Sequence, residues 1–185
     1  GRMLPDRTIH IDRNPAVNPD VVFDLEDGVP SKVLVRGEEI SLVNTVDEIH
    51  AYHIVEHLGE MGETETWFGF WRSCWRALKP LGVMYVISPY YLHEDAVGDP
   101  THSRLICKQT FSFLDRALYV REAGQPGSSV SQFGIDFALP IQDMRLKVKD
   151  GESIPAMILV ELTCRKTAEG GLVELVKPVP QEATV

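Results

Sequence analysis

The chain is 185 residues long, is 44% hydrophobic and 24% charged, and carries a formal net charge of -9. These values are ordinary for one soluble domain with a substantial core, and the acidic balance argues against nucleic acid as a partner. No apolar run reaches the length of a membrane span, so no membrane segment is predicted. Three widely spaced cysteines, without a C-x-x-C pair, indicate reduced thiols and therefore a cytoplasmic protein.

Short strands are predicted in the first third of the chain. Residues 8–12 and 21–24 are apolar runs that each end in an aspartate, which is typical of strands with polar groups at their carboxyl ends. Residues 32–43 predict a hairpin with its turn near Arg36-Gly37. A further strand is predicted over residues 46–51.

The clearest helix covers residues 64–78, where apolar side chains recur at spacings of three and four. Pro80 ends this pattern. The helix carries three tryptophans on one stripe, which we interpret as core rather than as a binding surface. Residues 83–88 then form a continuous apolar run, which predicts a fully buried strand.

The remaining pattern predicts a loop over 92–102, a short helix over 108–118 and two long strands over 133–148 and 156–164. Strands and helices therefore alternate, and two adjacent strands follow. This order favours an α/β fold with a mostly parallel sheet and an antiparallel C-terminal hairpin. We expect one domain over residues 1–166 and a tail over 167–185.

Five segments, in order, carry a family resemblance. They read TIHID from residue 8, VVFDL from residue 21, VDEIHAYHIVEHL from residue 46, WRALKPLGVMYVISP from residue 75 and DPTHSR from residue 99. Together they resemble class I, Rossmann-like S-adenosylmethionine-dependent methyltransferases of the type 11-like group. The resemblance implies a Rossmann-like sheet with helices on both faces, and S-adenosylmethionine as cofactor.

The resemblance also implies a set of cofactor contacts. The acid that ends the second strand of such enzymes binds the ribose hydroxyls, and Asp12 matches it; a carboxylate at a strand end can accept from two vicinal hydroxyls. Asp24 and Leu25 match the next strand tip, beside the adenine. Gly1 falls where the last glycine of the family's glycine-rich loop is expected, and Tyr52 follows the fourth strand, where the acceptor and the methyl group would meet.

Methyl transfer needs an aligned acceptor and a group that removes its proton. His53 or His102 is the expected proton acceptor, because an imidazole titrates near neutral pH. Asp99 and Arg104 belong to a loop expected to close over the acceptor. We expect this acceptor to be a small molecule or a glycan, methylated at oxygen or nitrogen, and association with further copies of the chain stays open.

Two features depart from the family pattern. Leu81-Gly82 stands where the group has two glycines. The first strand and most of the glycine loop have no counterpart, although in the family that strand lies between the second and fourth strands. Three explanations are open: further sequence upstream, a strand supplied by another chain, or remaining strands that have closed up.

Two other functions are open. The fold can serve as a non-catalytic binding or assembly module, which the missing loop favours. The second alternative is a zinc metallopeptidase, because His53-Ile54-Val55-Glu56-His57 reads H-x-x-E-H. That motif needs a stable helix, and glycines follow at once. The favoured interpretation therefore assigns no metal, and it gives Glu56 and His57 a structural role.

Overall fold

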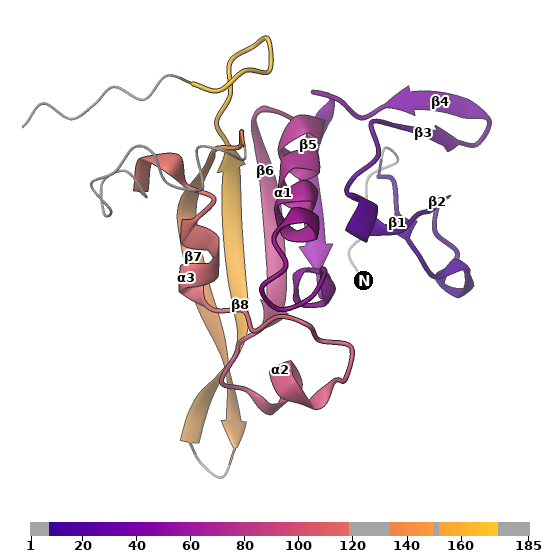
Figure 1. The fold of residues 1–185 in the computed structure, drawn as a ribbon. Coiled ribbons are helices and arrows are strands. Elements are labelled where there is room, and N and C mark those ends of the chain that lie inside the picture. The colour runs from indigo at the N-terminus through magenta and orange to yellow at the C-terminus, as the bar shows by residue number, and fades with distance from the viewer. Residues whose placement is uncertain (1–7, 119–133, 150–151, 174–185) are drawn as a thin grey trace, which may run out of the picture.

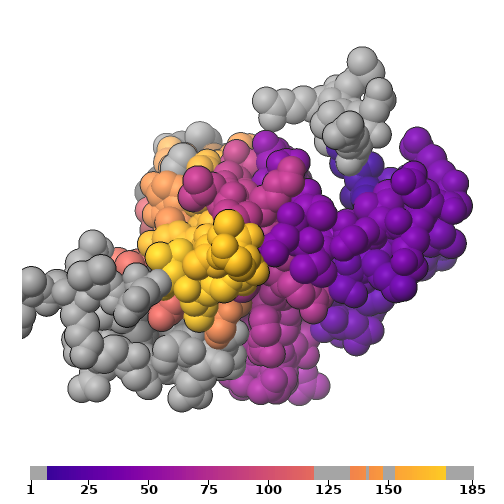
Figure 2. Space-filling view, turned by 90° about the horizontal axis from the view of Figure 1, so that it is seen from above, coloured from indigo at the N-terminus to yellow at the C-terminus, as the bar shows by residue number. Residues whose placement is uncertain are grey.

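The computed structural model describes residues 8–118, 134–149 and 152–173. Within these ranges the strands form three separate sheets, of two, two and four strands. Figure 1 shows the two small sheets beside one edge of the larger sheet. In Figure 2 the N-terminal residues, in indigo and purple, gather on one side, and the yellow residues near the end of the described ranges border part of them.

The first small sheet pairs β1 (Ile11–Asp12) with β2 (Val21–Val22) in parallel. The 3-10 helix η1 (Pro15–Val17) connects them. Both strands lie within the ranges predicted from the sequence, but regular pairing covers two residues in each. The aspartates that follow these apolar runs consequently lie at neighbouring carboxyl ends, since the Phe23 amide donates to the Asp12 carbonyl over 3.1 Å.

The second small sheet is a hairpin of β3 (Lys32–Val35) and β4 (Glu38–Ser41). Its two turn residues, Arg36 and Gly37, have φ angles of 53° and 84°. Two consecutive left-handed residues are what a type I′ turn requires, and this turn matches the twist of antiparallel strands. The predicted hairpin and the position of its turn are confirmed.

The largest sheet has the strand order β5-β6-β8-β7. These strands are β5 (Val46–Tyr52), β6 (Leu78–Pro89), β7 (Phe137–Lys149) and β8 (Glu152–Cys164). β5 and β6 are parallel, whereas β8 is antiparallel to both of its neighbours. Antiparallel pairing therefore dominates the largest sheet.

The helix α1 (Glu65–Ala77) forms the centre of the main core. Trp71 is completely buried and makes edge-to-face contacts with Trp67 and Phe111, with ring centroids 5.4 and 6.0 Å away. Trp75 is also buried, and its indole nitrogen donates to the Asp136 carbonyl over 3.0 Å. The predicted helix and the core role of its tryptophans are confirmed.

The expectation of a Rossmann-like, mostly parallel sheet with helices on both faces is wrong. Along β6, Met84 and Val86 are fully buried, while the alternate residues Val83, Tyr85 and Ile87 are only partly buried. The same alternation runs along β8. A sheet covered by helices on both faces would bury both sets of side chains. Instead one face packs against α1 and the other stays half-exposed, so 83–88 is not the fully buried strand predicted.

The expected place of the absent first strand also differs from the family arrangement. In the family that strand lies between the counterparts of β1 and β5, but here β1 and β5 belong to separate sheets in the part of the chain that the structure describes. The remaining strands have therefore not closed up by pairing with one another, which excludes the third of the three explanations.

Leu81 and Gly82 lie in an irregular, bulged stretch of β6, where the pairing with β5 passes from the pair Val46 and Leu78 to the pair Glu48 and Val83. Leu81 has a left-handed φ of 63°, and its side chain is 74% exposed. Burial of the side chain therefore offsets little of the backbone strain. A Cβ on Gly82 would lie 3.0 Å from the Lys79 carbonyl oxygen and 3.1 Å from that of Asp47. Glycine would therefore suit both position 81 and position 82, but only position 82 has it.

Two short helices lie around the larger sheet. α2 (Glu94–Gly98) falls within the predicted loop 92–102, where the His93 side chain accepts from the Asp95 amide over 3.2 Å and begins the helix. α3 (Lys108–Ser112) is shorter than the helix predicted over 108–118. Histidine is an uncommon first residue, which explains why the sequence pattern does not reveal α2.

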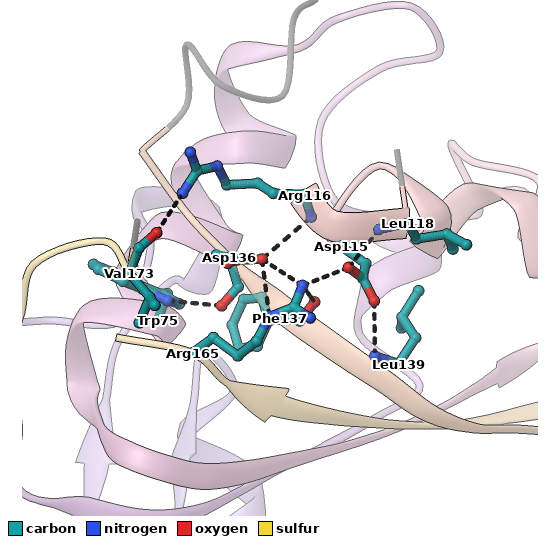
Figure 3. Close-up of polar contacts among 9 residues, drawn as sticks. All are labelled: Trp75, Asp115, Arg116, Leu118, Asp136, Phe137, Leu139, Arg165 and Val173. Carbon is teal, nitrogen blue, oxygen red and sulfur yellow. Dashed lines mark hydrogen bonds and ion pairs between the residues drawn. The ribbon is translucent and has the colours of Figure 1, made fainter. Parts of the chain in front are cut away.

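A buried ionic cluster joins the end of β8 to the start of β7 (Figure 3). The Arg165 guanidinium donates to the carboxylates of Asp136, over 2.6 Å, and Asp115. The Asp136 side chain is completely buried, whereas that of Arg165 is 26% exposed. Asp115 also accepts from the Leu139 and Leu118 amides, so the cluster fixes three backbone segments.

Candidate functional site

The site begins where β5 ends. The His53 amide still donates to the Ile87 carbonyl over 2.8 Å, which extends the parallel pairing with β6 by one bond. The chain then turns sharply, because His53 has a φ of 55°, a left-handed conformation that costs a non-glycine residue about 1–3 kcal/mol. This turn leaves the imidazole half-exposed at the carboxyl end of the strand.

The 3-10 helix η3 (Val55–His57) places a carboxylate behind that imidazole. Glu56 is 1% exposed, and its Oε1 lies 3.2 Å from Nδ1 of His53. Neither carboxylate oxygen accepts a hydrogen bond from any described residue. Nδ1 of His53 therefore lies close to this oxygen, but the two groups do not have hydrogen-bond geometry. A buried carboxylate without donors is rare, because burial removes its water.

The loop after α2 supplies the opposite side of the site. Asp99 accepts from the Thr101 amide and hydroxyl over 2.8 and 2.7 Å, and these bonds lower the pKa of its carboxyl. Nδ1 of His57 lies 3.1 Å from the Thr101 carbonyl oxygen. His102 directs Nδ1 at the Ala96 carbonyl oxygen over 3.2 Å. The imidazoles of His57 and His102 meet edge to face, with centroids 4.7 Å apart.

These groups line one open pocket with a volume of about 760 Å³. Its lining comprises His53, His57, Glu94, Asp95, Gly98, Asp99, Pro100 and His102. Both proton-acceptor candidates, His53 and His102, are thus brought together with Asp99. His53 is the more accessible of the two, because the His102 side chain is 8% exposed.

Arg104 does not line the pocket; it binds the loop after α2 to the backbone that follows η3. Its guanidinium donates to the carbonyls of Leu58 and Glu63, and it lies 4.9 Å from the Trp67 ring centroid. The Ser103 and Arg104 amides both donate to the Glu56 carbonyl, over 2.9 and 3.1 Å. Arg104 therefore positions the loop that carries His102.

The two candidate cofactor acids lie away from this pocket, at the ends of β1 and β2. Oδ1 of Asp12 accepts from the Asn14 amide over 2.7 Å, and Oδ1 of Asp24 accepts from the Glu26 amide over 3.0 Å. Each acid therefore begins a turn with one oxygen. Oδ2 of Asp12 has no hydrogen-bond partner among the described residues, and Oδ2 of Asp24 lies 3.9 Å from an Arg13 nitrogen. One oxygen of each acid is left for hydroxyl donors.

The other candidate cofactor residues differ in their surroundings. Leu25 begins the 3-10 helix η2 (Leu25–Asp27) and packs against the main core. Tyr52 is 45% exposed, and its hydroxyl contacts Nδ1 of His50 over 2.7 Å. His50 also contacts Glu48 over 3.0 Å, so alternate residues of β5 form a polar row on one strand face. Gly1 lies outside the described residues.

Sequence reasoning gave Glu56 and His57 structural roles and missed that they face His102. The burial of Glu56 depends on a loop almost fifty positions later in the chain, so no local pattern reveals it. The H-x-x-E-H motif does contribute to the site, but not from one α-helix, because His53 is left-handed and η3 covers only three residues. The arrangement of two imidazoles on one helical face, which a zincin requires, is therefore not formed.

The chain matches no protein-family model, and the comparison with curated proteins found no relative. None of the helices in the described ranges is long and apolar enough to cross a membrane. The functional argument consequently depends on the motifs and on the geometry of the site.

Proposed function

We propose that the chain binds S-adenosylmethionine and transfers its methyl group to an oxygen or nitrogen of a small-molecule or glycan acceptor in the cytoplasm. When bound, this cofactor supplies a methyl group already activated on a sulfonium, so the protein must align the acceptor and remove its proton. One observation carries the proposal: a half-exposed imidazole, His53, lines a pocket at the carboxyl end of a parallel strand, backed by the buried Glu56 carboxylate.

His53 is the proton acceptor in this proposal. Because Nδ1 lies 3.2 Å from the Glu56 carboxylate, Nε2 is the nitrogen proposed to meet the acceptor's hydroxyl or amine. The proton of the acceptor would pass to Nε2 as its oxygen or nitrogen bonds to the methyl carbon, while the bond from that carbon to sulfur breaks and the neutral thioether leaves with the electron pair. Glu56 then stabilises the positive charge on the imidazole, because its buried carboxylate is poorly screened by water.

Asp12 and Asp24 hold the nucleoside end of the cofactor in this proposal. Their carboxylates lie at neighbouring strand ends, and each keeps one oxygen for a hydroxyl donor. The segment after Asp24 is bonded to the chain that follows η3, since Glu26 accepts from the Gly59 amide over 3.2 Å. The carboxylates along the pocket rim favour a neutral or cationic acceptor over an anionic one. The three free cysteines agree with a cytoplasmic location.

The cofactor site is tested by calorimetry with S-adenosylmethionine and its demethylated product. We expect the Asp12→Asn variant to weaken binding about 10-fold to 100-fold, because a hydrogen bond to a charged group contributes about 1.5–3 kcal/mol. The matched control is Asp20→Asn, which changes a carboxylate at the opposite end of β2 that accepts from the His10 amide. No cofactor binding by the wild type, or equal affinity in both variants, would contradict the assignment.

The catalytic role is tested by screening small-molecule and glycan acceptors for methyl transfer. We expect His53→Gln to keep its affinity for the cofactor and to transfer the methyl group about 10²-fold to 10⁴-fold more slowly, the usual contribution of a general base. His50→Gln, an exposed imidazole on the same strand, is the control. If the wild type binds the cofactor and methylates none of the acceptors, the non-catalytic binding module replaces methyl transfer as the function.

A further inference from the structure

Three side chains that could bind a metal ion lie close together beside the pocket. Glu56, His57 and His102 each offer one candidate ligand atom, and these atoms lie within 4.8 Å of one another. The first two residues belong to η3 and the third to the loop after α2. Such a set of imidazoles and a carboxylate is the donor combination found around catalytic zinc ions.

The buried carboxylate is the first argument for a ligand. Glu56 is 1% exposed, and both of its oxygens lack a hydrogen-bond donor in the part of the chain that the structure describes. His53 approaches one oxygen without hydrogen-bond geometry. Proteins rarely leave a buried anionic group in this state, because its lost hydration is not replaced. A bound cation would supply the missing partner.

The orientation of the two imidazoles is the second argument. Nδ1 of His57 lies 3.1 Å from the Thr101 carbonyl oxygen, and Nδ1 of His102 lies 3.2 Å from the Ala96 carbonyl oxygen. A carbonyl oxygen can only accept. The Thr101 hydroxyl also lies 3.2 Å from Nδ1 of His57, but it donates its hydrogen to Asp99, so Nδ1 carries the hydrogen in both rings. Nε2 is then left with its lone pair. Histidines that bind metals are usually held in this way, by a hydrogen bond from the other ring nitrogen.

Backbone hydrogen bonds hold the two halves of the donor set together. The Glu56 carbonyl accepts from the amides of Ser103 and Arg104, which directly follow His102. These bonds join the two halves of the donor set through the backbone, so little ordering remains to be done when a metal binds.

We propose that Glu56, His57 and His102 bind a divalent transition-metal ion of the zinc class, whose open coordination position faces the pocket that both histidines line. Two imidazoles and one carboxylate suit zinc, cobalt or nickel better than magnesium or calcium, which take oxygen ligands. The site differs from the H-x-x-E-H motif of peptidases, because His53 is not a ligand and Glu56 is one.

Metal binding is measured by calorimetry with Zn²⁺ on the full chain after treatment with a chelator. We expect one zinc ion per chain. His57→Gln and His102→Gln should weaken binding more than about 100-fold, since even the loss of an outer partner costs about 10-fold to 100-fold. His50→Gln removes an exposed imidazole outside the cluster and should leave the affinity unchanged. Equal affinity in His102→Gln, or a loss in His50→Gln, would place the metal elsewhere and overturn the proposal.

The Glu56→Gln variant separates metal binding from folding. In the metal-free chain this change removes a buried charge without a donor, so we expect an unchanged or higher Tm. Added Zn²⁺ should raise the Tm of the wild type and not that of the variant. No zinc-dependent rise in the wild type, or saturation by Mg²⁺ instead, would refute the zinc-class site. The test needs no cofactor or acceptor, so its outcome is independent of methyl transfer.

Discussion

Replacing Arg165 with methionine should strongly destabilise the chain. The substitution keeps most of the side-chain volume and removes the cation between two carboxylates, those of Asp136 and Asp115. Removing one partner of a buried ion pair costs about 3–5 kcal/mol, because the remaining charge stays buried and unpaired. The Arg165 side chain is 26% exposed, which admits some water, so we expect the lower end, about 3 kcal/mol.

The measurement is urea-induced unfolding of the wild type and of three variants. Arg165→Lys keeps the charge but loses the two-pronged guanidinium, so it should fall between the wild type and Arg165→Met. Adding Asp136→Asn to Arg165→Met should recover part of the lost free energy of unfolding, since it removes the unpaired charge. A loss under about 1 kcal/mol in Arg165→Met, or no recovery in the double variant, would refute an ionic role for this cluster.

The destabilisation should also depend on pH. Burial raises the pKa of the Asp136 carboxyl in the folded chain above its value in the unfolded chain. Without Arg165 that shift grows. A carboxyl with a raised folded pKa favours the folded state at low pH and loses this contribution as pH rises through the folded pKa. Arg165→Met should therefore be closest to the wild type in mild acid and furthest from it above neutral pH.

Two other predictions concern single side chains. At pH 8 a thiol reagent should modify Cys107 in the folded chain but should modify Cys74 and Cys164 only in urea. Burial raises the pKa of the Cys74 and Cys164 thiols, that of Cys164 to about 12. Rapid reaction of all three cysteines in buffer would show that the core opens easily. Leu81→Gly should raise the free energy of unfolding, measured by urea titration, by about 0.5–1 kcal/mol. Glycine removes the strain of the left-handed φ at this position, and we expect this gain to exceed the conformational entropy that glycine adds to the unfolded chain. A loss of stability would show that the exposed leucine contributes to packing.

Local patterns were sufficient for the elements that depend on neighbouring residues. The spacing of the tryptophans predicts α1 because the apolar side chains recur once per helical turn, and this period is visible within the segment itself. The Arg36-Gly37 turn is similarly local. The sheet arrangement was not predictable in this way. A continuous apolar run over 83–88 looks the same whether one or both strand faces are covered, and the strand partners of β6 lie far away in sequence.

The candidate site shows the same division. His53, His102 and Asp99, which were chosen from their motif positions, line one pocket in the structure. The role of Glu56 depends on backbone bonds from Ser103 and Arg104, which fold a distant loop over it. Neither the burial of that carboxylate nor the direction of the imidazoles has a counterpart in residue spacing.

The bond between His57 and the Thr101 carbonyl has a consequence for the order of folding. It joins positions 44 residues apart, and closing so long a segment is entropically unfavourable until α1 and β6, which lie between them in the sequence, have packed with β5. The donor set should therefore be completed after the core has formed. If zinc is added during refolding, it should bind in the final kinetic phase. The rate of zinc binding would then report the rate at which the loop that carries His102 packs against η3.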